Sequence, residues 1–303
     1  MKPFTVLSIQ SHVACGHVGN RSAVFPLERL GIEVLAVNTV QYSSHAGRPG
    51  WKGLTLPPEH IREVVEALSA QGELAHCDAV LSGYMGHAGQ AILDAVALVR
   101  QTNPAALYCC DPVMGDLPGG LYVAADIPDL MRTRAIPASD IVTPNLFEAS
   151  CLSGITIEDP AGTAEAVRRI HQLGPRIVVL TSYSLPGMED TGFFLSYRHP
   201  DPAGATTCSQ YLLRTPRLAF PMPPKGAGDL FSALFLGQYL RRGNPGAALE
   251  MAASALYTVL EATIARGRSD LAIVAAQGGL EQPPRRFRCQ EFHIPLESSA
   301  ENP

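Results

Sequence analysis

Short, nearly continuous apolar runs alternate with stretches of helical periodicity along most of this 303-residue chain. The strand-like runs are residues 4–10, 33–40, 79–82, 106–110, 140–142 and 176–180. The helix-like stretches, with apolar residues every three to four positions, are residues 20–30, 58–70, 90–100, 163–172, 229–241 and 245–265. Strands that are apolar on both faces are typical of a parallel sheet covered by helices on both sides. The sequence therefore predicts an α/β fold with a central, mostly parallel sheet.

Three segments depart from this alternation. Residues 191–197 and 210–214 predict an antiparallel pair of strands near the sheet edge, joined by a polar loop over 198–209. Residues 41–54 contain glycines, a proline and Trp51, are too irregular for a helix or strand, and predict a flap over a site. Residues 283–303 predict a peripheral tail, of which 287–294 are apolar enough to dock. Since no repeat or low-complexity linker divides the chain, we expect one domain over residues 1–303.

Composition excludes several classes of function. With 23 Lys+Arg against 28 Asp+Glu, the chain has no basic surplus for binding nucleic acid or an anionic membrane. The first residues lack a signal-peptide pattern, and no stretch is expected to reach the ~20 apolar residues of a membrane span. The seven cysteines include no C-x-x-C pair and no zinc-ligand spacing. These features predict a protein of the reducing cytoplasm.

Polar residues and glycines follow the predicted strands. Open parallel sheets bind ligands at the carboxyl ends of their strands, so these positions predict a site spread over many loops. They are Ser11, Gln41, residues 83–86, Asp111, Asn145 and residues 181–182.

The sharpest motif is Lys-Gly-Ala-Gly-Asp at residues 225–229, directly before an apolar helix. Glycines allow a close backbone approach, and a helix start offers unpaired N–H groups, so Gly226, Ala227 and Gly228 could hold a transferring phosphoryl group. Asp229 could then act as general base on an alcohol. The alternative, that Asp229 is an N-cap and the glycines form a turn, is equally compatible with the motif alone.

Two further segments carry acidic groups. Asp111 and Asp116, in a Pro/Gly loop after a buried strand, could hold a divalent metal, although a solvated turn explains them as well. Thr143, Asn145 and Glu148 suit contacts to metal-bound water and phosphate, or else mark a helix start with Glu148 favouring the dipole.

Other common site motifs are missing from the sequence. It has no Walker P-loop and no G-x-G-x-x-G. The histidines at 12, 17, 45 and 87 lack the helical spacing of zinc ligands, so loop or substrate contacts are favoured for them.

Taken in order, these segments resemble the ribokinase-like small-molecule kinases and, within them, the pyridoxal kinases. The resemblance spans residue 7 to about 277. It is most specific at residues 9–13 (Ile-Gln-Ser-His-Val), 16–20 (Gly-His-Val-Gly-Asn), 38–43 (Asn-Thr-Val-Gln-Tyr-Ser) and 82–84 (Ser-Gly-Tyr). The acidic turn, residues 143–148 and the Gly-Ala-Gly-Asp motif complete the series. The last motif is common to the whole superfamily.

The resemblance implies a ribokinase-like fold with a small flap, and transfer of phosphate from ATP to the 5′-hydroxymethyl group of pyridoxal, with pyridoxine and pyridoxamine as related substrates. It implies Asp229 as base and the amides of residues 226–228 as phosphoryl contacts. The implied substrate side comprises Ser11, Val18, His45, Ala46, Gly47, Tyr84 and Asp229. The implied ATP side comprises Asp111, Thr143, Asn145, Glu148, Thr181, Ser182, Arg214, Thr215, Pro216 and Arg217. The implied metal ligands are Asp111, Asp116 and Glu148. Such kinases use Mg²⁺ or another divalent cation, are often helped by K⁺, and are usually homodimers.

Some positions depart from the family pattern. Many bacterial members have Thr-Gln after the flap histidine, where this chain has Ala46 and Gly47, and many have lysine at the position of Thr181. Lys225 could add a phosphate contact or could simply be exposed to solvent. Two alternative functions also stay open: a hydroxymethylpyrimidine or sugar kinase of the same fold, and a pyridoxal phosphate binder without turnover.

Overall fold

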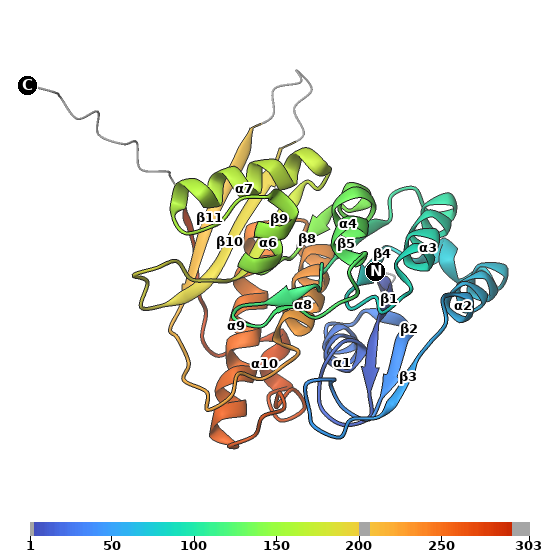
Figure 1. Cartoon of the computed structure of the whole chain (residues 1–303), viewed down its shortest axis with the longest axis horizontal. Helices are drawn as coiled ribbons and strands as arrows, with labels where there is room; N and C mark the ends of the chain where they lie inside the picture. Colours follow the sequence, from blue (N-terminus) through green and yellow to red (C-terminus); the bar gives the residue numbers. More distant parts are fainter. Residues whose placement is uncertain (1–2, 200–206, 293–303) are drawn as a thin grey trace, which may run out of the picture.

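A ten-stranded sheet between two layers of helices forms the centre of the computed structural model, which describes residues 3–199 and 207–292 (Figure 1). The sheet order is β12-β11-β10-β9-β8-β5-β4-β1-β2-β3. Strands from β2 to β9 pair in parallel, whereas β3 at one end and β10, β11 and β12 at the other pair antiparallel. The predicted α/β fold with a mostly parallel sheet is confirmed.

The strands are β1 (Thr5–Val13), β2 (Glu33–Tyr42), β3 (Gly53–Thr55), β4 (Ala79–Ser82), β5 (Leu107–Cys110), β6 (Gly115–Asp116), β7 (Gly120–Leu121), β8 (Ile141–Val142), β9 (Ile177–Tyr183), β10 (Thr191–Arg198), β11 (Cys208–Thr215) and β12 (Cys289–Glu291). The helices are α1 (Asn20–Arg29), α2 (Pro58–Ala70), α3 (Gly89–Thr102), α4 (Ile127–Leu130), α5 (Ile136–Ala138), α6 (Leu146–Ser153), α7 (Pro160–Leu173), α8 (Ala227–Arg242), α9 (Pro245–Ala265) and α10 (Gly278–Glu281). A 3₁₀ turn, η1 (Glu73–His76), and a π-helical turn, η2 (Met131–Ala135), complete the elements.

Two hydrophobic cores lie on opposite faces of the sheet. Successive strand residues point to opposite faces, so Leu7 and Val80 enter the core under α2, α3, α6 and α7, whereas Val6 and Leu81 enter the core under α1, α8 and α9. Both cores need apolar strand residues at every position. This is why the strands read as continuous apolar runs.

The structure corrects the prediction for the flap. Its outer residues are strand: residues 41–42 end β2 and residues 53–54 begin β3, which pair antiparallel, so the irregular part is residues 43–52. The short hairpin of β6 and β7 and the helical turns of residues 127–138 were not predicted, because they are too short for a periodic pattern.

Within the described residues, the predicted edge strands and part of the predicted tail are present. Strands β10 and β11 pair antiparallel, and β12, from the predicted tail, pairs with β11. Of the predicted loop 198–209, residue 198 and residues 208–209 belong to strands, while 200–206 lie outside the described residues, as do 293–303 of the tail.

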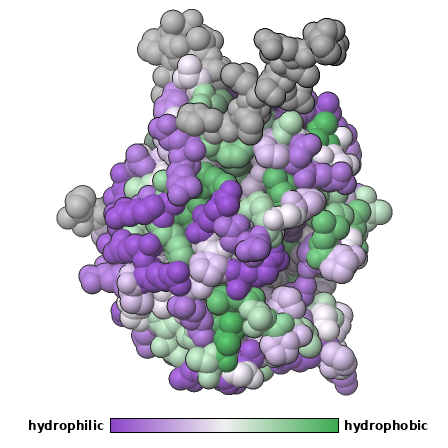
Figure 2. Space-filling view, turned by 90° about the vertical axis from the view of Figure 1, so that its left-hand side faces the viewer, coloured by the Kyte–Doolittle hydropathy of each residue, from purple (hydrophilic) through white to green (hydrophobic). Residues whose placement is uncertain are grey.

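Helix α9 contradicts the expectation that no segment is long and apolar enough to span a membrane. Its length and composition suffice, but 61% of its most apolar window is buried inside the structure, and no other helix in the described ranges meets the same criteria. The face shown in Figure 2 is largely hydrophilic, with hydrophobic side chains in separate patches. Burial against the sheet therefore accounts for the apolar composition of α9.

A buried histidine makes stability depend on pH. His171, on α7, contacts the carbonyl oxygen of Pro175 through Nδ1 at 2.8 Å and Ser196 Oγ through Nε2 at 2.9 Å. Burial lowers the pKa of His171 from 6.5 to about 4. The unfolded chain therefore binds a proton below pH 6.5 that the folded protein excludes until about pH 4.

We expect the free energy of unfolding to fall as the pH drops from about 6.5 to about 4, by on the order of 1–3 kcal/mol from this residue. Urea unfolding at pH 7 and pH 5 measures the change. His171→Gln, which does not titrate, should be less stable at pH 7 and should lose less stability at pH 5. Equal losses in both proteins would remove His171 as the cause.

Candidate active site

Helix α8 begins with exposed donor groups. Gly226 is its N-cap in the left-handed region, with φ 91°, and the first intrahelical bond runs from the N–H of Leu230 to the carbonyl of Gly226 at 3.0 Å. The N–H groups of residues 227–229 therefore point out of the helix end, which carries a partial positive charge. Asp229 is the third helical residue and makes no cap, so the N-cap alternative is wrong.

The loop after β1 packs directly on this helix start. A Cβ atom at Gly226 would lie 1.8 Å from the carbonyl oxygen of His17, and one at Gly19 would lie 2.1 Å from that of Ser11, so both positions require glycine. The Gly19 N–H also hydrogen-bonds the Asp229 carboxylate. Gly19 thus lies between Ser11 and Asp229, and it brings the predicted substrate contact beside the predicted base.

Burial makes the Asp229 carboxylate more basic. It raises the pKa of Asp229, while the hydrogen bond from the Gly19 N–H acts in the opposite direction. A carboxylate with a raised pKa is a stronger base than an exposed one, which suits a group that accepts a proton from an alcohol.

A second carboxylate lies at the same helix end. Asp111, buried after β5, accepts a hydrogen bond from Ser232 Oγ at 3.1 Å, and Ser232 Oγ is 2.8 Å from Thr143 Oγ1. Burial raises the pKa of Asp111 well above its usual range, and the carboxylates of Glu148 and Asp229 add to the rise. The ends of β5 and β8 are thereby tied to α8.

Glu148 serves as a backbone cap. It forms a capping box with Asn145: Oε2 accepts from the Asn145 N–H at 2.9 Å, and the Asn145 side chain accepts from the Glu148 N–H. Its Oε1 accepts from the Met114 N–H at 3.0 Å. Burial raises the pKa of Glu148 to about 7. The predicted helix start is therefore present, and Glu148 positions the acidic loop after β5.

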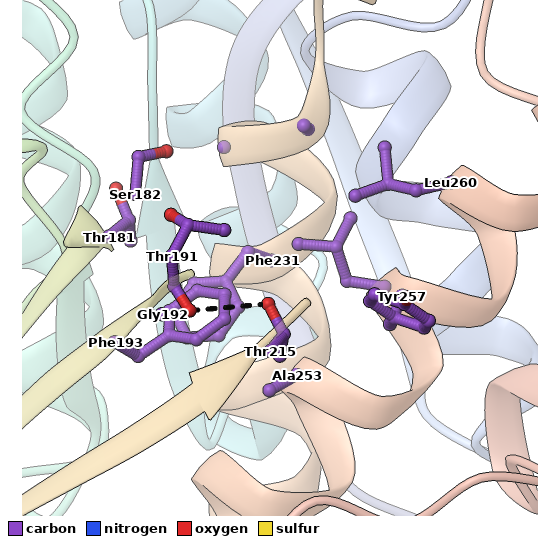
Figure 3. A pocket seen from close by; sticks show the side chains of 13 residues that line it. Thr181, Ser182, Thr191, Gly192, Phe193, Thr215, Phe231, Ala253, Tyr257 and Leu260 are labelled. Carbon is purple, nitrogen blue, oxygen red and sulfur yellow. Dashed lines mark hydrogen bonds between the residues drawn. The ribbon is translucent and has the colours of Figure 1, made fainter. Parts of the chain in front are cut away.

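A cavity of about 120 Å³ opens beside the start of α8 (Figure 3). Its polar side comes from the ends of β9, β10 and β11, and its apolar side from α8 and α9. The Phe193 and Phe231 rings stack, with centroids 4.4 Å apart. Ser182 is the only non-glycine residue in the described part of the chain with a positive φ, 51°. The lining residues are Thr181, Ser182, Thr191, Gly192, Phe193, Thr215, Ala227, Gly228, Phe231, Ala253, Leu256, Tyr257 and Leu260.

The cavity gathers some of the residues expected on the ATP side. Thr181, Ser182 and Thr215 line it together with Ala227 and Gly228 of the glycine motif. The apolar wall was missed because α9 carries no motif: its uniformly apolar sequence indicates burial but gives no sign of a ligand.

The arginines expected near the nucleotide do not line the cavity. Arg214 pairs with Asp190 at 3.5 Å, and Arg217 donates to the Asp190 carbonyl at 3.1 Å. Pro216 is exposed. Of this segment only Thr215 lines the cavity, while the two arginines join the end of β11 to the loop before β10.

The residues expected on the substrate side lie on β1, its following loop, the flap and the loop after β4. Ser11 is buried within β1, which extends three residues beyond its predicted end, and Val18 is half-buried in the next loop. Tyr84 is half-buried, its carbonyl accepts from Thr39 Oγ1 at 2.8 Å, and burial followed by the nearby Tyr42 raises its pKa.

The flap, residues 43–52, carries His45, Ala46 and Gly47. An ion pair and an aromatic contact connect it to the rest of the protein. Arg48 forms an ion pair with Asp270 at 3.0 Å, in the turn after α9. The rings of Tyr42 and Trp51 have centroids 4.6 Å apart. His45 is half-buried, and burial followed by the charge of Arg48 lowers its pKa.

Comparisons with known proteins identify the family of the chain. The sequence matches the phosphomethylpyrimidine kinase family over residues 34–273. It is 45% identical to a pyridoxal kinase of Deinococcus radiodurans, covering 95% of this chain and 96% of the relative. It is 46% identical to one of Rubrobacter xylanophilus, covering 93% and 95%. The structure of a Leishmania donovani pyridoxal kinase in complex with ADP and pyridoxine matches with a TM-score of 0.87, 31% identity, and coverage of 95% and 99%. This chain therefore belongs to the phosphomethylpyrimidine kinase family and, within it, to the pyridoxal kinases.

Proposed function

We propose that this kinase transfers the terminal phosphate of ATP to the 5′-hydroxymethyl group of pyridoxal, and also of pyridoxine and pyridoxamine, in vitamin B6 salvage. The observation that carries the proposal is the placement of Asp229: its carboxylate lies at a helix end rich in N–H donors, with Gly19 joining it to Ser11. The relatives named as pyridoxal kinases support the choice of alcohol.

Each part of the site has a role in this reaction. The cavity between β9, β10, α8 and α9 takes the nucleobase, and the phosphates extend toward Gly226, Ala227 and Gly228. The N–H groups there stabilise the charge on the phosphoryl group during transfer. Asp229 removes the proton of the hydroxymethyl group. Ser11, Val18 and Tyr84, with His45, Ala46 and Gly47 of the flap, hold the pyridine ring and exclude water.

The acidic residues fit a divalent cation that takes most of its ligands from phosphate and water. No group of three or more His, Cys, Asp or Glu forms a metal cage within residues 3–199 and 207–292. Mg²⁺ in kinases commonly uses one or two carboxylates and keeps several waters. Asp111 is the carboxylate we propose for Mg²⁺, with Asp116 and Glu148 nearby. Bound Mg²⁺ would neutralise the charge of the phosphates.

We further propose that the protein works in the cytoplasm as a homodimer, is helped by K⁺, and binds neither nucleic acid nor membranes. The net charge of −5 disfavours binding to nucleic acid or an anionic membrane, and the seven unpaired cysteines are typical of a reducing compartment.

The test is ATP-dependent phosphorylation of pyridoxal by the purified protein, with hydroxymethylpyrimidine and ribose as parallel substrates. We expect turnover on pyridoxal well above the other two. Preferred turnover on hydroxymethylpyrimidine would favour the function for which the matched family is named. Binding of pyridoxal phosphate without turnover on any of the three would make the protein a binder.

Asp229→Asn is expected to lower kcat by ~10²–10⁴ while the Kd of pyridoxal changes little, because the amide cannot accept the proton but fills the same space. Steady-state kinetics and calorimetric binding measure the two effects. Asp129→Asn changes an exposed first-turn acid of α4 and should leave both unchanged. Near-normal turnover of Asp229→Asn would exclude it as the base.

Loss of the Arg48–Asp270 ion pair is expected to loosen the flap. Partly exposed ion pairs of this kind are weak, so Arg48→Met should speed chymotrypsin cleavage at Trp51 only modestly, by ~2–5-fold in the free protein. Pyridoxal with an ATP analogue should protect the flap in both proteins. Arg62→Met, which breaks the exposed pairs with Glu59 and Asp94, is the control. Equal cleavage with and without ligands would show that the flap does not close on them.

A further inference from the structure

Lys225 joins two loops at the mouth of the site. Its Nζ atom lies 2.7 Å from Asp116 Oδ2, so an ion pair connects the β6–β7 hairpin with the residue directly before Gly226. The lysine side chain is 54% exposed and the aspartate side chain 39%, and exposed ion pairs of this kind are weak. A more highly charged anion can therefore displace Asp116.

The ammonium group also acts on the flap. The positive charge of Lys225 is one of the causes that lower the pKa of His45, after burial and Arg48, while Asp270 opposes them. The hairpin, the start of α8 and the flap thus all lie within electrostatic reach of one ammonium. In the proposed function, the alcohol under the flap and the phosphoryl group at α8 meet between these three elements.

We propose that Lys225 binds the phosphoryl oxygens of the transferred group, and that Asp116 holds the lysine in place while the site is empty. This inference rests on the proposed function and names the residue that recognises the phosphate ester it produces. Phosphate displaces Asp116, and Asp116 recovers the ammonium when the product leaves.

The residue type fits such an exchange. The chain contains 23 Lys+Arg, of which only Lys2, Lys52 and Lys225 are lysines. An ammonium is a compact charge with three rotatable donors and can change partners, whereas a guanidinium favours a fixed bidentate pair with one carboxylate. At a position that exchanges a carboxylate for a phosphate, lysine is the better choice.

The proposal gives the two partners of one ion pair opposite effects on phosphate binding. Lys225→Met removes the phosphate contact, while Asp116→Asn removes its competitor. The ligands are pyridoxine 5′-phosphate and pyridoxine, whose Kd values are compared by calorimetry on the full chain. Neither ligand has an aldehyde that could react with lysine. Divalent cations are left out and ionic strength is fixed, so a metal at Asp116 does not contribute.

Lys225→Met is expected to weaken binding of the phosphate ester by ~10-fold or more and to change that of pyridoxine by less than ~2-fold. Asp116→Asn is expected to tighten binding of the ester by ~2–5-fold. Arg241→Met, which removes one positive charge from an exposed pair with Glu281 at the other end of α8, should leave the ratio of the two Kd values unchanged.

Unchanged ester binding in Lys225→Met would overturn the proposal. Equal weakening by both variants would also overturn it, because a purely structural ion pair gives both partners the same sign. Failure of the proposed function is read separately, as absence of ATP-dependent turnover of pyridoxal by the wild-type protein, whereas the Kd comparison tests the role of Lys225.

Discussion

The contact between the loop after β1 and the start of α8 is the constraint on which the site depends. Two chain segments more than 200 residues apart touch backbone to backbone, with the Gly226 Cα against the His17 carbonyl, where no side chain fits. This close approach sets the start of α8 against the loop that carries His17 and Gly19. It also delivers the Gly19 N–H to Asp229. The position of the Asp229 carboxylate and its pKa are therefore influenced by the same packing.

Around this contact, negative groups surround a positive helix end. Asp111, Glu148 and Asp229 are all drawn toward neutrality by burial, and Asp111 also by its acidic neighbours. The hydrogen bonds from Ser232 to Asp111 and from the Gly19, Met114 and Asn145 N–H groups hold the carboxylates in place. The site therefore suits a ligand that brings both a cation and phosphates. A cation reduces the repulsion between the carboxylates, and phosphate oxygens accept from the unpaired N–H groups at the start of α8.

The sheet was predictable from sequence because burial on both faces leaves a continuous apolar run, as at residues 79–82. The polar residues that follow the predicted strands were expected at the ligand-binding edge of a parallel sheet, and their contacts to a ligand stay a prediction. The cavity beside the start of α8 shows the limit of prediction from sequence. Thr181 and Ser182, which belong to β9, were expected at the site because they follow the predicted strand 176–180. Tyr257 and Leu260 are ordinary helix residues in sequence, and only the packing of α9 against α8 brings them to the cavity. Likewise, no local pattern indicates that Lys225 meets Asp116, 109 positions earlier.

The wall of the cavity is also part of the core on the α8 and α9 face. Phe193, Phe231, Ala253 and Leu256 belong to both. A mutation that reshapes this cavity therefore also disturbs the packing that supports the fold, whereas the exposed residues of the flap, such as Ala46 and Gly47, can vary at the surface. Under the proposed function, divergence among such enzymes should be slow for the site of the phosphate donor and fast for the site of the alcohol. Directed evolution would meet the same asymmetry, with acceptor specificity open to change and donor specificity bound to thermal stability.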